Sequence, residues 1–185
     1  QDVINKARNA GISYYASIDD DEAYFNHNLL EKSISWLSKA NEIKISYDIN
    51  KPGHQFYNQF PGEHYRLLAG ICLVEKPNIA IDIGTHTGMS SRVFLDYSTA
   101  KILTFDLINW QEFDSYLNND DFDSNRISQS LDDLSVLDNF EKHKNTFKDS
   151  DLIFLDGPKN VKFEEKLLKF LFQLDFPSKK RYLVV

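Results

Sequence analysis

The sequence is short of cysteine, methionine and glycine, and each shortage limits the kind of protein it can be. Its 185 residues include one cysteine, Cys72, one methionine, Met89, and seven glycines. A single cysteine excludes an intramolecular disulfide framework and a zinc site built from four thiolates. Because glycines are so few, we expect them where the backbone needs a conformation that other residues avoid.

The sequence also lacks an excess of basic over acidic residues, and it has no long hydrophobic run. Its formal net charge is −7, and its isoelectric point is near 5.2. Nucleic acids and anionic membranes attract basic surfaces, so neither is expected as a partner. No apolar run approaches the ~20 residues that cross a bilayer. The free thiol suits a reducing compartment, and we therefore expect a cytoplasmic protein.

What the sequence does contain is enough apolar material for a packed core. Hydrophobic residues make up 42% of the chain and aromatic residues 14%. At roughly 150 residues per domain, this length suits one structural domain. The chain begins with Gln1, and its one methionine lies far from that end. We therefore expect the native start to lie outside this sequence.

The sequence pattern of the first part of the chain, residues 1–77, predicts helices and loops. Apolar residues recur at helical spacing over residues 21–40 and again over residues 63–75. Between them lies an aromatic loop, residues 54–60, and Pro77 is expected to stop the second helix. We expect this part to form a helical cap that covers an acceptor pocket.

After Pro77, short β-rich runs alternate with helical stretches. Strands are predicted over residues 78–83, 101–106, 126–130, 151–156 and 181–185, and helices over residues 89–97, 133–143 and 163–174. This alternation is typical of βαβ units. It predicts an α/β fold for residues 78–185, with a Rossmann-like, open, mostly parallel sheet and helices on both faces.

A glycine loop between the first strand and its helix is the most informative segment. It contains Asp82, Gly84 and Gly88 in a D-x-G-x-x-x-G pattern. In an open α/β sheet, ligands bind beyond the carboxyl ends of the strands. Gly84 would allow a sharp turn and a close ligand, and Gly88 would bring a helix N-terminus near an anion. The alternative is a tight strand-to-helix turn that binds nothing.

The spacing of this loop separates the candidate cofactors. A dinucleotide site needs glycine where His86 stands, and a phosphate loop needs a different spacing and a lysine. The pattern resembles motif I of class I S-adenosylmethionine-dependent methyltransferases. Further matches follow in order over residues 61–185. Asp106 ends the second strand, where that family binds the ribose, residues 130–132 follow the third, where it frames the adenine, and Asp156 ends the fourth.

Within that family, the chain resembles most the small O-methyltransferases of the catechol and caffeoyl-coenzyme A type. Ser90 stands where they bind the methionine carboxylate of the cofactor. Asp156 and Lys159 have the spacing of their metal-binding aspartate and general-base lysine. Gly157 and Pro158 depart from the bulkier pair usual between them, which puts the direction of the lysine in doubt. The alternatives are that Asp156 caps the last helix and that Lys159 is a solvated surface residue.

The resemblance implies a complete set of site residues. Cofactor binding falls to Asp82, Gly84, Thr85, Gly88, Ser90, Asp106, Leu107, Ser130, Leu131 and Asp132, catalysis to Asp156 and Lys159, and metal binding to Asp156. A divalent cation such as Mg²⁺ would lower the pKa of an acceptor hydroxyl and orient it. The family's other metal ligands follow its fifth strand, so we expect them, with the last strands, beyond Val185.

The sequence thus predicts an S-adenosylmethionine-dependent methyltransferase that O-methylates a small hydroxylated acceptor with the help of a divalent metal. One alternative is a catalytically inactive relative that binds the cofactor without transferring a methyl group. A nucleotide-binding oxidoreductase is another, disfavoured by the missing G-x-G. The acceptor is expected to be a small molecule, and a homo-oligomer is left open.

Overall fold

The computed structural model describes residues 27–59, 62–158, 160–175 and 181–185. The chain divides into two compact units, Gln1–Ser33 and Ile34–Val185. The described part of the first unit is the beginning of helix α2 (His27–Glu42), where the Ser33 hydroxyl donates to the Leu29 carbonyl at 2.8 Å. The predicted helix from residue 21 therefore lies partly outside the described residues. The boundary predicted at Pro77 falls inside the second unit.

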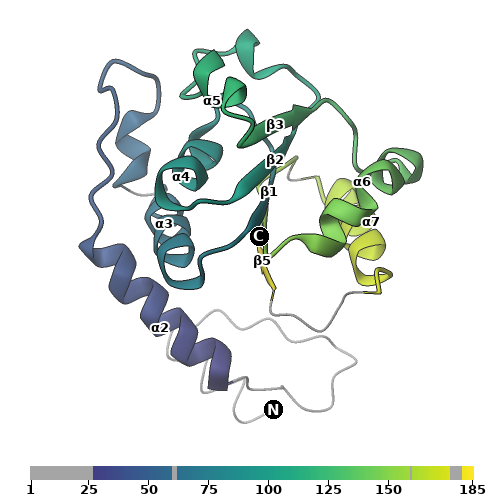
Figure 1. Ribbon diagram of the computed structural model, residues 1–185, viewed down its shortest axis with the longest axis horizontal. Coiled ribbons are helices and arrows are strands. Elements are labelled where there is room, and N and C mark those ends of the chain that lie inside the picture. Colours follow the sequence, from purple (N-terminus) through teal and green to yellow (C-terminus); the bar gives the residue numbers. More distant parts are fainter. Residues whose placement is uncertain (1–26, 60–61, 159, 176–180) are drawn as a thin grey trace. The chain divides into compact units, whose positions relative to one another are not determined.

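The second unit is built on a five-stranded parallel sheet (Figure 1). Its strands are β1 (Ile79–Ile83), β2 (Lys101–Phe105), β3 (Ile127–Ser130), β4 (Leu152–Leu155) and β5 (Tyr182–Val184). They lie in the order β3-β2-β1-β4-β5, and every neighbouring pair is parallel. The chain therefore builds outward from β1 on one side and then returns to β1's other side. That reversal places a topological switch point between β1 and β4.

Helices cover both faces of the sheet (Figure 1). The elements are η1 (His54–Tyr57), α3 (His64–Glu75), α4 (Met89–Tyr97), η2 (Trp110–Glu112), α5 (Asn119–Asp123), α6 (Leu137–Asp149) and α7 (Lys162–Phe172). Helices α3 and α4 contribute to one apolar cluster, and α6 and α7 contribute to another. Strand side chains alternate between the clusters, so Ala80 joins the first and Ile81 the second. The predicted α/β fold is confirmed.

Helix α6 begins later than the sequence predicted. Residues from Asp133 onward were expected to be helical, but the helix begins at Leu137. The Asp133 carboxylate accepts a hydrogen bond from the Ser135 N–H at 2.8 Å, and the Asp133 carbonyl accepts one from the Val136 N–H at 3.1 Å. An aspartate that bonds its own following backbone favours a turn over a helix. The predicted start was therefore wrong by one turn.

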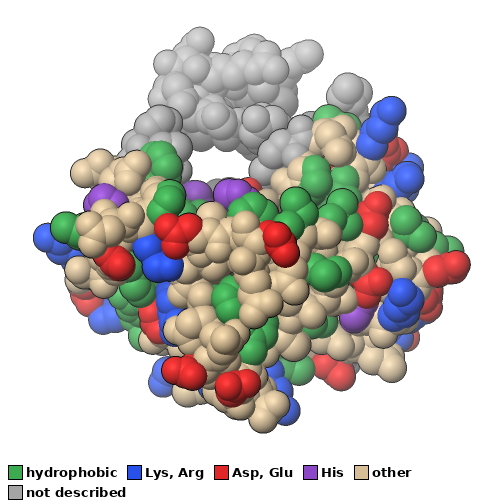
Figure 2. All heavy atoms as spheres, turned by 90° about the horizontal axis from the view of Figure 1, so that it is seen from above, with side chains coloured by type: hydrophobic (Ala, Val, Ile, Leu, Met, Phe, Trp, Pro, Cys, Tyr) green, Lys and Arg blue, Asp and Glu red, His purple; other side chains and the backbone are tan. Residues whose placement is uncertain are grey.

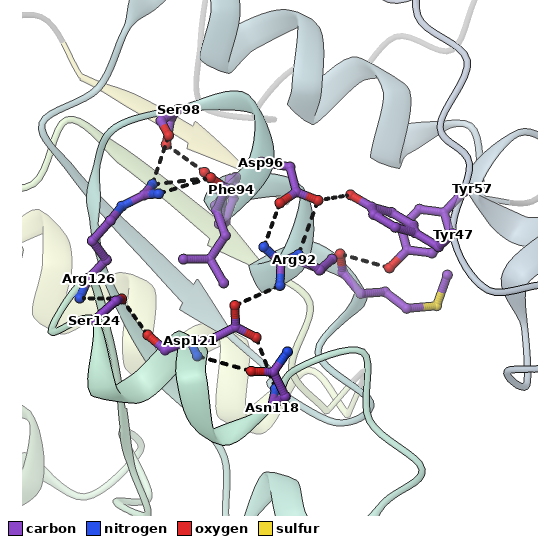
Figure 3. A network of polar contacts seen from close by, with 12 residues as sticks. Tyr47, Tyr57, Arg92, Phe94, Asp96, Ser98, Asn118, Asp121, Ser124 and Arg126 are labelled. Atoms are coloured by element: carbon purple, nitrogen blue, oxygen red, sulfur yellow. Dashed lines mark hydrogen bonds and ion pairs between the residues drawn. The ribbon is translucent and has the colours of Figure 1, made fainter.

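A network of charged groups ties the surrounding loops to α4 (Figure 3). Arg92 forms ion pairs with Asp96 on its own helix, at 2.5 Å, and with Asp121 on α5, at 2.7 Å. The Tyr47 hydroxyl donates to Asp96 at 2.7 Å. The network joins the segment before η1 and helix α5 to α4, the helix that follows the glycine loop.

None of the described helices has the length and apolar character of a transmembrane span. On the face seen in Figure 2, acidic and basic side chains of the described residues are interspersed.

Candidate functional site

A cleft of about 500 Å³ opens at the carboxyl ends of the parallel strands. The residues that line it include Gly84 after β1, Asp106 and Leu107 after β2, Asp132 after β3 and Asp156 after β4. Residues from the start of α7, including Phe163, form the remaining wall. The acids that follow three successive strands of the sequence are thus brought into one cleft. The cleft lies at the switch point, the expected place for a ligand in an open α/β sheet.

The carboxylate of Asp106 is held in place by the backbone around it. Its Oδ2 accepts a hydrogen bond from the N–H of His86 at 2.8 Å. Its Oδ1 accepts from Leu107 at 2.7 Å and from Ile108 at 3.2 Å. His86 adopts a φ of +43°, a left-handed conformation that side chains other than glycine rarely take. A carboxylate offers about four acceptor positions, and three of them are used here, so Asp106 has about one position left for a hydroxyl of a ligand.

Gly84 lies where two strands meet at the switch point. Its φ is +109°, and a Cβ added there would lie 2.4 Å from the carbonyl oxygen of Asp156. The N–H of Gly84 donates to the Phe105 carbonyl at 2.9 Å, and the N–H of Asp156 donates to the Ile83 carbonyl at 2.8 Å. The missing side chain of Gly84 therefore allows the ends of β1 and β4 to touch.

Gly88, the other glycine of the loop, makes room for a different neighbour. Its φ is +78°, and an added Cβ would lie 2.6 Å from Cγ of Leu117. It immediately precedes α4, whose first N–H groups have no partner within the helix. Its lack of a side chain is thus needed for the approach of the loop that contains Leu117.

Asp82 is buried beneath the glycine loop and does not line the cleft. Its side chain is 0% exposed. Oδ2 accepts from the hydroxyl of Ser90 at 2.8 Å and from that of Ser91 at 2.5 Å, whereas no described group donates to Oδ1. The pKa of Asp82 is raised to about 7. Burial is the largest cause; the two serine hydroxyls lower the pKa, and the nearby carboxylates Asp156 and Asp106 raise it further.

This arrangement affects the role predicted for Ser90. A serine hydroxyl has one proton to donate, and that of Ser90 is already directed at Asp82. Binding a ligand carboxylate through this hydroxyl would require the proton to be redirected. Thr85 is also engaged, because its hydroxyl shares a 2.7 Å hydrogen bond with the buried hydroxyl of Thr104.

The structure thus divides the predicted cofactor residues into two groups. Gly84, Asp106, Leu107 and Asp132 line the cleft, whereas Asp82, Thr85, Gly88, Ser90, Ser130 and Leu131 do not. The second group contains buried residues below the loop and residues at the end of β3. Their predicted contacts with a cofactor stay predictions.

Asp132 is held by donors from two elements. Its Oδ2 accepts from the Ser130 hydroxyl at 2.7 Å and from Nε2 of His143 at 2.8 Å. Its Oδ1 accepts from Nζ of Lys142 at 3.0 Å. The hydrogen bonds from His143, Ser130 and Lys142 hold the pKa of Asp132 well below its usual range. Sequence reasoning missed His143, because it lies on α6, eleven positions from its partner, and belongs to no motif.

Asp156 and Lys159 were predicted to carry the chemistry. Asp156 lines the cleft and is exposed, whereas Lys159 lies outside the described residues. Asp156 is not the cap of the last helix, because α7 begins at Lys162, and the N–H of Phe163 is bound by the side chain of Asn160 at 2.9 Å.

The described residues supply few donors for the predicted divalent cation. Within residues 27–175 and 181–185 as described, no group of three or more His, Cys, Asp or Glu side chains is arranged to hold a metal ion. Asp156 is the one predicted ligand that can be placed. A divalent cation therefore stays a prediction.

The fold and the cleft together define an α/β protein with a cleft at the switch point of a parallel sheet, where a small molecule could bind. The cleft volume lies within the ~300–1,000 Å³ typical of such sites. Comparison with known protein families and with curated proteins found no match.

Proposed function

We propose that this protein is an S-adenosylmethionine-dependent methyltransferase that O-methylates a small hydroxylated acceptor. The observation that carries this proposal is the meeting of Asp106, Asp132 and Asp156 in one cleft beside Gly84. These acids follow β2, β3 and β4 in the order of the methyltransferase motifs that the sequence resembles. Binding one nucleoside cofactor requires these side chains to share a cleft, and they do.

The cleft offers suitable partners for the nucleoside of the cofactor. Asp106 has about one acceptor position left for a ribose hydroxyl, and its three backbone contacts hold the carboxylate in place. Asp132 would accept a hydrogen bond from the adenine amino group. Leu107 and Ile108 are 64% and 49% exposed and line the cleft beside these acids, where an aromatic base would cover them. Burial of such apolar area favours binding by about 25 cal/mol per Å².

The chemistry would take place near the end of β4. The cofactor supplies an electrophilic methyl group on a sulfonium. The protein must align the acceptor hydroxyl with that group and help to remove its proton. Asp156, which lines the cleft, would orient the acceptor, and Lys159 is the proposed base. A lysine acts as a base near neutral pH only where burial or a neighbouring cation lowers its pKa.

Calorimetry with the purified chain tests the proposal. S-adenosylmethionine and S-adenosylhomocysteine should bind, and NAD⁺ should not. Asp106→Ala should weaken S-adenosylhomocysteine binding by about tenfold, since it removes one charge-assisted hydrogen bond to the ribose. Asp138→Ala, an exposed acid on α6, is the matched control and should bind like the parent.

Three outcomes would count against the proposal in different ways. Binding of NAD⁺ alone would favour the oxidoreductase alternative, and binding of none of these ligands would refute the cofactor assignment. Binding of S-adenosylmethionine without methyl transfer to any hydroxylated acceptor would favour the inactive cofactor-binding alternative. In the same calorimeter, a Mg²⁺ titration that Asp156→Ala leaves unchanged would refute the metal assignment.

A further inference from the structure

We propose that His143 is a positioning residue that braces the Asp132 carboxylate from behind the cleft wall, so that the site selects a base carrying an amino donor. The proposal rests on the proposed function, because it concerns the same cleft. His143 belongs to none of the motifs found in the sequence.

His143 touches two parts of the cleft wall. Its Nε2 lies 2.8 Å from Oδ2 of Asp132 and 3.2 Å from the hydroxyl of Ser130. Its ring packs edge-on against Phe105, with centroids 4.8 Å apart and planes at 81°. The described residues that line the cleft include Asp132 and Phe105 but not His143. His143 therefore supports the wall without taking a ligand contact of its own.

The proton positions follow from the chemistry of the partners. An ionised carboxylate can only accept hydrogen bonds, so Nε2 of His143 must carry the proton that it shares with Asp132. The hydroxyl of Ser130 donates to the same oxygen. Two donors on Oδ2 set the plane of the carboxylate and leave Oδ1 for other partners. The Oδ1 partner within the protein is Lys142, whose side chain is 57% exposed.

A carboxylate held in this way discriminates between purine bases. The 6-amino group of adenine donates a hydrogen bond to it, whereas the 6-oxo group of hypoxanthine would place an acceptor against an acceptor. An acceptor placed against a carboxylate is repelled and forms no hydrogen bond with it, so the 6-oxo ligand should bind more weakly. His143 would sharpen this selection by preventing Asp132 from turning away.

Two substitutions of His143 separate its hydrogen bond from its ring contact. His143→Phe keeps an aromatic ring against Phe105 and removes the donor. His143→Gln removes the ring and places an amide N–H near the former Nε2. Lys144→Ala is the matched control, because Lys144 lies on the same helix and pairs with Glu141 at 2.9 Å.

Calorimetry with S-adenosylhomocysteine and its 6-oxo analogue, S-inosylhomocysteine, measures the selection. The parent should prefer the 6-amino ligand by about 100-fold. His143→Phe should weaken S-adenosylhomocysteine binding about tenfold and lower the preference to a similar extent, the order expected for one charge-assisted hydrogen bond. His143→Gln and Lys144→Ala should keep the preference. An unchanged preference in His143→Phe, or an equal loss in His143→Gln, would overturn the proposal.

A second variant covers the case in which His143→Phe does not fold. Ser130→Ala removes the other donor to Oδ2 without touching the ring contact. It should lower the preference for the 6-amino ligand about threefold. A preference unchanged by Ser130→Ala would then overturn the brace.

A readout without ligand separates this proposal from the proposed function. Carbon-13 NMR of labelled aspartate carboxyls follows the ionisation of Asp132, which Asp132→Asn identifies. The titration midpoint should rise by about one pH unit in His143→Phe and stay nearer the parent value in His143→Gln. If the parent binds neither nucleoside, the proposed function fails. This titration then decides whether His143 braces Asp132, and an unmoved midpoint in His143→Phe refutes it.

Discussion

Replacing Asp82 with asparagine should remove a pH dependence from the stability of this protein. The side chain is 0% exposed, and its Oδ2 accepts hydrogen bonds from Ser90 and Ser91. Burial raises the pKa of Asp82 from 3.8 to about 7. The folded protein therefore holds this proton more tightly than the unfolded chain does. The stability that protonated Asp82 contributes is fully present below its unfolded pKa and is lost as the pH rises through its folded pKa.

The size of the effect follows from these two pKa values. A tenfold change in proton affinity corresponds to 1.36 kcal/mol, so full ionisation of Asp82 destabilises the folded state by roughly 4 kcal/mol. About 3 kcal/mol of this loss falls between pH 5 and pH 8. An asparagine cannot ionise, and its oxygen can still accept from Ser90 and Ser91. Its amide N–H would take the place of Oδ1, and an unpaired buried donor costs about 1–3 kcal/mol at every pH.

Urea unfolding followed by tryptophan fluorescence at pH 5, 6, 7 and 8 measures this difference. Other titrating groups affect both proteins, so they cancel when Asp82→Asn is compared with the parent. Relative to the parent, the variant should gain roughly 3 kcal/mol of stability from pH 5 to pH 8. Asp138→Asn, on the exposed surface of α6, should show no such gain. A difference that changes by less than about 1 kcal/mol over this range would refute the reasoning.

Two further predictions concern the loop and its support. Gly84→Ala should destabilise the protein by roughly 3 kcal/mol, because its φ is +109° and the added Cβ would lie 2.4 Å from the Asp156 carbonyl oxygen. Gly157→Ala, whose added Cβ would meet side chains alone among its three nearest atoms, with a Phe163 ring carbon nearest at 3.0 Å, should lose less in urea unfolding; equal losses would contradict this prediction. Arg92→Met should destabilise by about 2 kcal/mol, because Asp96 and Asp121 would lose their shared partner. Thermal unfolding checks this against Lys169→Met, which removes the exposed pair with Glu165 and should change little; similar effects in both would refute it.

The sequence alone predicted the elements that depend on local patterns. The helix predicted over residues 89–97 coincides with α4, because Gly88 before it and the apolar spacing within it act over a few residues. The strands after Pro77 were found because buried parallel strands have short, continuous apolar runs. Their alternation with helices also indicated that the sheet would be parallel. The start of α6 was missed because a single side chain, Asp133, competed for the backbone.

The candidate site was predictable only in part, for a related reason. The acids Asp106, Asp132 and Asp156 could be placed because each ends or follows a strand, and the carboxyl ends of parallel strands share one edge. The burial of Asp82 below the loop could not be read from its motif, since burial depends on what packs over it.

Contacts between distant segments were decided by the tertiary structure. His143 meets Asp132 because α6 packs beside the end of β3, and Gly84 meets Asp156 because β4 returns to the other side of β1. The sequence carries local propensities over a few residues. Which groups then form a hydrogen bond, and how far a pKa is shifted, depends on distances and burial that exist only once the sheet has formed.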